Sequence, residues 1–195
     1  MPNILTSSRI LIAIIIPLLL FLGNTLSIGV LYLVSFTLFV FASITDFFDG
    51  WIARKNNLET EIGRILDPIA DKLLVILTLI PLINKFNDLF IISSIVIIFR
   101  EILVSGLRES IKSEELILKV TLLSKWKTAI QLIAISSALM YKSLAHLGMN
   151  NNILNLLIEL SWYFSFLIIL AALLSLLTGF NYLLKVYYFY KKESS

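Results

Sequence analysis

Four of the five aspartates in this 195-residue chain fall between residues 46 and 71. They form two pairs, Asp46 with Asp49 and Asp67 with Asp71, spaced three and four residues apart. Residues at these spacings lie on one face of an α-helix, so each pair would project from its own helix. A short connection would make the two helices antiparallel neighbours. Four carboxylates converging in a partly dry cavity repel one another, and bound cations would relieve that repulsion.

Carboxylate ligands without His or Cys favour hard ions, so the pattern predicts two divalent cations, Mg²⁺ or Mn²⁺. Two such ions about 3.5–4 Å apart are the arrangement used in many phosphoryl transfers. In the alternative interpretation, the aspartates only pair with basic neighbours at a membrane surface. That alternative does not explain the small residues beside them, which would let a bulky ligand approach the backbone: Gly50, Ala53 and Gly63.

Membrane helices must position these aspartates, because 58% of the residues are hydrophobic and only 15% are charged. The uncharged run from Ile10 to Thr45 is about twice the length of one transmembrane helix, and Gly23-Asn24 would divide it. We therefore expect an all-α, polytopic membrane protein with six transmembrane helices in a single domain, residues 1–195. Further apolar runs stand at residues 73–84, 89–99, 128–141 and 160–184, with loops near 23–28, 54–62, 85–88, 109–122 and 142–153.

Three of the apolar runs are too short to cross about 30 Å of hydrocarbon unless they extend into charged sequence. Ionisable side chains at membrane depth normally face a polar cavity or one another. We therefore expect one cavity lined by charged residues of the third, fourth and fifth helices. These residues are Asp67, Asp71, Lys72, Arg100, Glu101, Arg108, Lys125 and Lys127.

Six spans would place all but two of the 16 basic residues on one side, the exceptions being Lys85 and Lys142. The positive-inside tendency makes that side cytoplasmic, so we expect a multi-pass protein of the inner membrane whose cavity faces the cytoplasm. A net charge of +3 is too small to indicate nucleic-acid binding. The aromatic residues near the C-terminus are expected to anchor a helix at the headgroup level: Tyr182, Tyr187, Tyr188 and Tyr190.

The aspartates and small residues occupy eight fixed positions that resemble the signature of the CDP-alcohol phosphatidyltransferase family: Asp46-x2-Asp49-Gly50-x2-Ala53-Arg54-x8-Gly63-x3-Asp67-x3-Asp71. Three further segments are similar to the bacterial phosphatidylglycerophosphate synthases of that family. They are Pro2-Asn3-x2-Thr6-x2-Arg9, Arg100-Glu101-Ile-Leu-Val-Ser-Gly-Leu-Arg108-Glu109 and Lys125-x-Lys127-Thr128-x2-Gln131.

This resemblance implies transfer of the phosphatidyl group of CDP-diacylglycerol to glycerol 3-phosphate, with release of CMP. Asp71 would be the general base, taking the proton of the attacking hydroxyl. Asp46, Asp49 and Asp67 would hold one ion, and Asp46, Asp67 and Asp71 the other. The CDP-lipid would be bound by Asn3, Thr6, Gly50, Ala53, Arg54 and Gly63. Members of the family are often homodimers in membrane lipid.

The acceptor phosphate would require cations, and four lie on the fourth and fifth helices: Arg100, Arg108, Lys125 and Lys127. The alternative for each is a positive charge that merely marks the cytoplasmic side. Other functions remain open at this point: a cardiolipin synthase or inositol-phosphate transferase of the same family, or a cation transporter without enzymatic activity.

Overall fold

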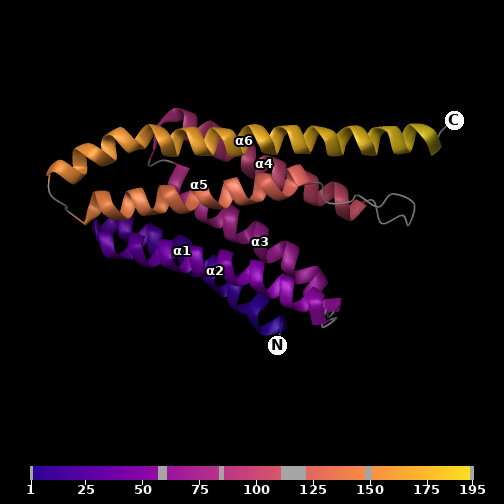
Figure 1. Ribbon diagram of the computed structural model, residues 1–195, viewed down its shortest axis with the longest axis horizontal. Coiled ribbons are helices and arrows are strands. Elements are labelled where there is room, and N and C mark those ends of the chain that lie inside the picture. The colour runs from indigo at the N-terminus through magenta and orange to yellow at the C-terminus, as the bar shows by residue number, and fades with distance from the viewer. Residues whose placement is uncertain (1, 57–60, 84–85, 111–121, 148–150, 194–195) are drawn as a thin grey trace.

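The computed structural model describes residues 2–56, 61–83, 86–110, 122–147 and 151–193, of which the side chains at 2–5, 47–56, 61–62, 64–65, 109–110, 151–161 and 192–193 are not described. These ranges contain six α-helices and no strand (Figure 1). The helices are α1 (Pro2–Leu26), α2 (Gly29–Asn56), α3 (Glu61–Leu82), α4 (Asp88–Ser110), α5 (Leu122–His146) and α6 (Asn151–Glu193). The predicted all-α class is confirmed.

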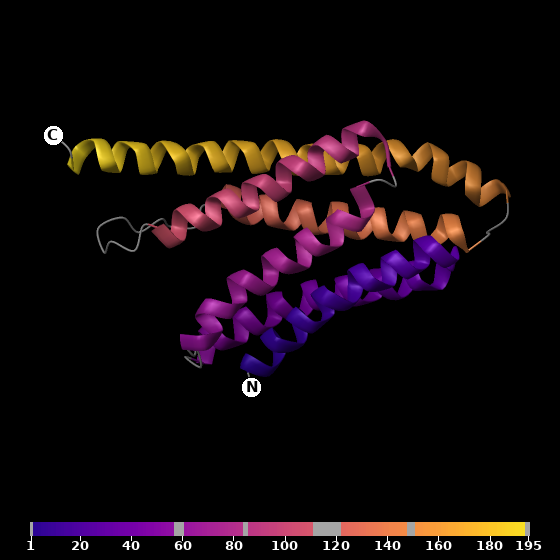
Figure 2. The same ribbon diagram turned by 180° about the vertical axis from the view of Figure 1, so that it is seen from behind.

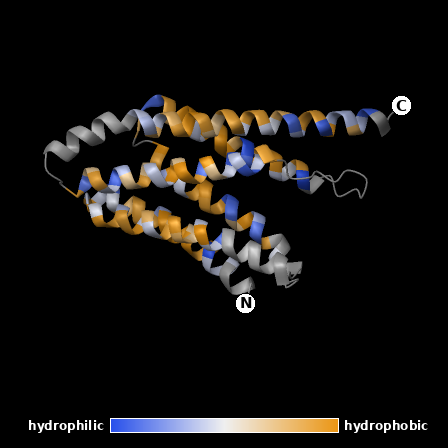
Figure 3. Cartoon of the chain, viewed as in Figure 1, coloured by the Kyte–Doolittle hydropathy of each residue, from blue (hydrophilic) through white to orange (hydrophobic). Residues whose placement is uncertain are grey.

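Five of the helices are long and apolar enough to cross a membrane, within α1, α2, α4, α5 and α6. Large apolar side chains such as Phe21 and Phe99, each 63% exposed, point away from the helix bundle, as lipid-facing residues do. Helix α3 is not among the five, and Figure 3 shows hydrophilic positions in its N-terminal half. The chain is therefore a multi-pass membrane protein, and α3 is the helix that falls outside these five spans.

The turn between α1 and α2 differs from the expected break at Gly23-Asn24. Helix α1 runs through these two residues to Leu26, and the chain turns at Ser27, which adopts a positive φ of 55°. The Asn24 side chain accepts a hydrogen bond from the Tyr32 hydroxyl of α2. Glycine is common within membrane helices, and Gly23 lies inside α1 rather than at its end.

Helix α1 packs against both α2 and α3, α2 packs against α5, and α6 packs against α4 and α5 (Figures 1 and 2). Among the described residues, direct packing between α2 and α3 is slight, so the prediction that these two helices are close neighbours was wrong. Helix α1 occupies that position because its buried face, which includes Ala13, Ile16 and Leu20, joins the same apolar core as residues of α2 and α3. The N-terminal helix therefore lies beside the aspartates of the motif.

The first turns of α3 and α5 and the last turns of α2, α4 and α6 lie toward one end of the molecule (Figures 1 and 2). The alternating direction of successive helices produces this arrangement. The charged half of α3 and the charged start of α5 therefore lie at the same end, where their side chains can line a common cavity.

Candidate active site

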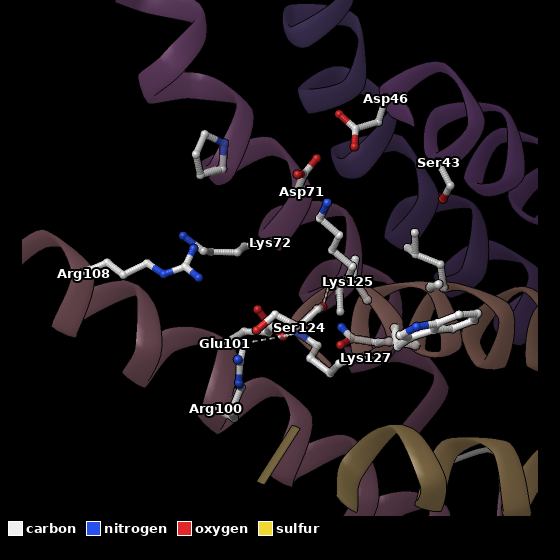
Figure 4. Close-up of a pocket in the computed structure, with 17 residues that line it drawn as sticks. Ser43, Asp46, Asp71, Lys72, Arg100, Glu101, Arg108, Ser124, Lys125 and Lys127 are labelled. Atoms are coloured by element: carbon white, nitrogen blue, oxygen red, sulfur yellow. Dashed lines mark hydrogen bonds and ion pairs between the residues drawn. The ribbon is translucent and has the colours of Figure 1, made fainter. Parts of the chain in front are cut away.

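A cavity of about 640 Å³ lies between α2, α3, α4 and α5. Its two ends differ in charge: Asp46 and Asp71 line one end, and basic side chains of α4 and α5 line the other (Figure 4). In Figure 4 the Lys125 side chain extends from α5 toward Asp71, between the two ends. Charged residues of α3, α4 and α5 therefore share one cavity, as predicted, except that Asp67 is not among the residues that line it.

At the acidic end, Arg9 of α1 joins carboxylates from two other helices. Its Nη1 atom lies 2.6 Å from Asp46 Oδ1 and 3.3 Å from Asp71 Oδ1. The Arg9 side chain is only 3% exposed, whereas those of Asp46 and Asp71 are 39% and 49% exposed. The guanidinium is thus buried behind two carboxylates that themselves reach the cavity.

The third aspartate is held by the same helix. The Thr6 hydroxyl donates a hydrogen bond to Asp67 Oδ1 at 2.6 Å, and Thr6 is buried. Thr6 and Arg9 are three residues apart and share one face of α1, which lies against both aspartate-bearing helices. Thr6 was among the predicted site residues and Arg9 was not. Their spacing of three residues, which places both on one face of a helix, could have indicated Arg9 as well.

The described side chains at this end suit a hard cation in their chemistry but do not form a complete ligand set. Asp46 and Asp71 lie close enough to share one cationic nitrogen, so they converge as carboxylate ligands of a metal would. Within the described part of the chain, no three metal-ligating side chains gather around one point. Asp67 is turned to Thr6, and the Asp49 side chain lies outside the described residues.

At the basic end, Glu101 of α4 is the centre of a buried ionic group. Its Oε1 atom accepts a hydrogen bond from Lys127 of α5 and lies 3.5 Å from Arg100 Nη1. The Arg100 Nη2 atom donates to Thr178 Oγ1 of α6 at 2.9 Å. Buried charges require such partners, and Glu101 neutralises part of the positive charge of both cations. Arg100 is buried, as its position after an apolar run predicted.

The other two predicted phosphate ligands, Arg108 and Lys125, are exposed. Arg108 Nη2 donates to the Tyr182 hydroxyl of α6 at 2.5 Å, and its guanidinium carbon lies 4.9 Å from the centre of the Tyr182 ring. Nearby, Lys72 Nζ donates to Ser105 Oγ at 2.5 Å. The four predicted cations therefore line one cavity, with Arg100 and Lys127 buried and Arg108 and Lys125 accessible.

Tyr182 does not have the surface position expected of a headgroup anchor, because it is only 4% exposed and is bonded to Arg108. The other tyrosines of that segment, Tyr187, Tyr188 and Tyr190, are exposed as expected. Thr178 was not among the predicted site residues. Glu101 was predicted to line the cavity, and the structure adds its ionic contacts with Arg100 and Lys127.

Several predicted CDP-lipid ligands lie where the structure describes the helix but not the side chains. These are Asn3 in α1 and Gly50, Ala53 and Arg54 in α2. Gly63 is buried in α3. Their contacts with a nucleotide stay predictions.

Known proteins are similar in sequence to this chain over most of its length. The sequence model of the CDP-alcohol phosphatidyltransferase family matches residues 1–177. A Rickettsia bellii protein is 41% identical over 184 residues, which are 93% of this chain and 92% of that protein. A Bacillus subtilis protein is 41% identical over 149 residues, which are 72% of this chain and 77% of that protein. Both are named CDP-diacylglycerol–glycerol-3-phosphate 3-phosphatidyltransferase. On these matches, together with the aspartate motif and the charged cavity, the chain belongs to the CDP-alcohol phosphatidyltransferase family.

Proposed function

We propose that this protein is a phosphatidylglycerophosphate synthase, which transfers the phosphatidyl group of CDP-diacylglycerol to glycerol 3-phosphate and releases CMP. The observation that carries the proposal is that one and the same cavity has carboxylates at one end and cations at the other (Figure 4). A diphosphate donor with bound cations suits the acidic end, and an anionic acceptor suits the basic end. The family membership and the names of the matched relatives point to the same reaction.

At the acidic end, Asp46, Asp49, Asp67 and Asp71 would hold two divalent cations, Mg²⁺ or Mn²⁺. When bound, these ions would neutralise the negative charge of the donor diphosphate and the charge that develops as CMP leaves. The chain's own contribution is to orient the carboxylates, through Arg9 on Asp46 and Asp71 and through Thr6 on Asp67. The resemblance assigns the remaining donor contacts to Asn3, Gly50, Ala53, Arg54 and Gly63.

In the transfer, an oxygen of glycerol 3-phosphate forms a bond to the lipid-linked phosphorus, and the bond from that phosphorus to the CMP oxygen breaks. The proton of the attacking hydroxyl passes to a carboxylate oxygen of Asp71. Asp71 suits this role because it lines the cavity and half of its side chain is exposed there. A general base must reach the proton that it removes, and an accessible carboxylate between the two charged ends can do so.

The basic end would bind the phosphate of the acceptor. Arg108 and Lys125 are accessible from the cavity, and Arg100 and Lys127 lie deeper with Glu101 between them. Arginine presents a planar fork of donors that matches a phosphate group, whereas neutral acceptors such as inositol would not need this charge. The charge at this end therefore favours glycerol 3-phosphate over neutral alcohols.

In the membrane, the cavity would open to the cytoplasm, because the basic residues concentrate on the side where α2, α4 and α6 end. The acyl chains of the donor would lie in the surrounding lipid. The proposal also includes a homodimer, which chemical cross-linking in native membranes would detect.

The test is transfer by the purified protein with CDP-diacylglycerol, labelled glycerol 3-phosphate and Mg²⁺. We expect CMP and labelled lipid in equal amounts, and loss of both with Asp71→Asn. The matched control is Asp88→Asn at the start of α4, which changes the one aspartate outside the motif and should keep full activity. An acceptor panel with inositol phosphate and phosphatidylglycerol separates the other reactions of the family. Ion flux without CMP release would instead support a transporter.

A further inference from the structure

One face of α6 contacts both arginines at the basic end of the cavity. Thr178 and Tyr182 are four residues apart on α6, so they share that face, and both are buried. Thr178 Oγ1 accepts from Arg100 Nη2 at 2.9 Å, and Tyr182 Oη accepts from Arg108 Nη2 at 2.5 Å. The two contacts hold side chains that lie two helical turns apart on α4.

The two helices approach closely between these contacts. Gly179 follows Thr178, and a Cβ atom added there would lie 3.1 Å from Arg100 Cγ. This is tighter than ordinary van der Waals contact, so the glycine lets the arginine stem pass against the α6 backbone. The position of Arg100 is therefore set by α6 as well as by Glu101.

Tyr182 holds Arg108 in two ways at once. Its hydroxyl accepts from the guanidinium, and its ring lies beneath the same group at 4.9 Å, a cation–π arrangement. An exposed arginine has many rotamers, and ordering them opposes ligand binding. A buried tyrosine that fixes the guanidinium beforehand reduces that entropic cost, while Arg108 still lines the cavity.

We propose that Tyr182 and Thr178 are positioning residues that preorganise Arg108 and Arg100 for the phosphate of the acceptor. The proposal deepens the function given above and rests on it. Both residues lie beyond residue 177, where the match to the family's sequence model ends. Acceptor selection in this protein therefore uses part of α6 that the aspartate motif does not include.

The central experiment is steady-state kinetics of Tyr182→Phe, which removes the hydroxyl and keeps the ring. We expect the KM for glycerol 3-phosphate to rise roughly three- to tenfold, the effect of one lost hydrogen bond to a charged group. The KM for CDP-diacylglycerol and kcat should stay within about twofold of wild type. The matched control is Tyr187→Phe on the same helix. The Tyr187 side chain is exposed and does not line the cavity, so loss of its hydroxyl should leave kcat and both KM values unchanged.

A second measurement separates positioning from general support of the fold. If Tyr182 acts through Arg108, adding Tyr182→Phe to Arg108→Gln should leave the KM for glycerol 3-phosphate at the value of Arg108→Gln alone. Independent effects that multiply in the double variant would overturn the proposal. Equal changes in kcat and in the KM of both substrates would overturn it as well.

Thr178 provides an independent pair of variants. Thr178→Val removes the hydroxyl at nearly constant shape and should raise the KM for glycerol 3-phosphate, whereas Thr178→Ser should restore it. An unchanged KM in both Tyr182→Phe and Thr178→Val, in a wild-type enzyme that does form lipid from glycerol 3-phosphate, would refute the positioning role and leave the proposed function standing. A wild-type protein that transfers to a different acceptor would instead refute the proposed function.

Discussion

Arg9 Nη1 lies 2.6 Å from Asp46 Oδ1 and reaches from the first helix into the carboxylate cluster of the motif. The same nitrogen contacts Asp71, so a single buried guanidinium links α1 to α2 and α3. A positive charge between two carboxylates lowers the repulsion that would otherwise separate them. The acidic end of the cavity therefore depends on a helix that carries none of the aspartates.

Replacing Arg9 should reduce catalysis strongly. In Arg9→Met the two carboxylates lose their shared partner and repel each other, so we expect kcat to fall by about 100-fold or more, while Arg9→Lys keeps part of the activity. Release of CMP measures the effect. Lys185→Met serves as control, because Lys185 is an exposed cation of α6 that does not line the cavity. Near-normal kcat in Arg9→Met would contradict the orienting role of Arg9.

Divalent cations should be required for transfer. Removal of metal with EDTA is expected to abolish CMP release, and Mg²⁺ or Mn²⁺ should restore it, because carboxylate ligands prefer hard ions. Asp67→Asn should raise the Mn²⁺ concentration needed for half-maximal binding, measured by electron paramagnetic resonance without substrate. Asp88→Asn should leave Mn²⁺ binding as in wild type. Full turnover in EDTA would contradict the proposal that the aspartates hold divalent cations needed for transfer.

The ion pair of Glu101 with Lys127 should show strong coupling. Lys127→Met leaves Glu101 with Arg100 as its remaining ionic partner, and Glu101→Gln leaves two buried cations uncompensated. Breaking a buried pair costs about 3–5 kcal/mol, so each single variant should unfold at a lower temperature. The double variant should lose much less than the two single effects combined. Thermal unfolding followed by circular dichroism measures this, and simple additivity would show that the two side chains do not interact.

Gly29 should be needed for the contact between α2 and α5. A Cβ atom at residue 29 would lie 2.7 Å from the backbone carbon of His146, which cannot move without shifting the end of α5. Gly29→Ala should therefore reduce stability by about 1–3 kcal/mol. Gly106→Ala in α4 is the matched control, since nothing lies within 4 Å of its added Cβ and alanine favours a helix. Equal melting temperatures of the two variants would contradict this packing.

Local features of the sequence were sufficient to predict the helices and the type of chemistry. Apolar runs and charged interruptions predicted six transmembrane helices. The described residues form six helices, of which five are long and apolar enough to cross a membrane. Spacings of three and four residues placed the aspartates in pairs because helix geometry relates residues close in sequence. The turn at Ser27 lies within the loop expected near residues 23–28, but Gly23 and Asn24, where the break was expected, lie inside α1.

Residue types and their spacing were enough to predict the membrane class, the motif and the concentration of charge on α3, α4 and α5. The contacts of Arg9 with the aspartates and of Tyr182 with Arg108 depend on the packing of the helices. Arg9 is 62 residues from Asp71, and Tyr182 is 74 residues from Arg108. Residues so distant meet only because α1 packs on α3 and α6 packs on α4, and that packing results from the apolar faces of whole helices rather than from any short motif.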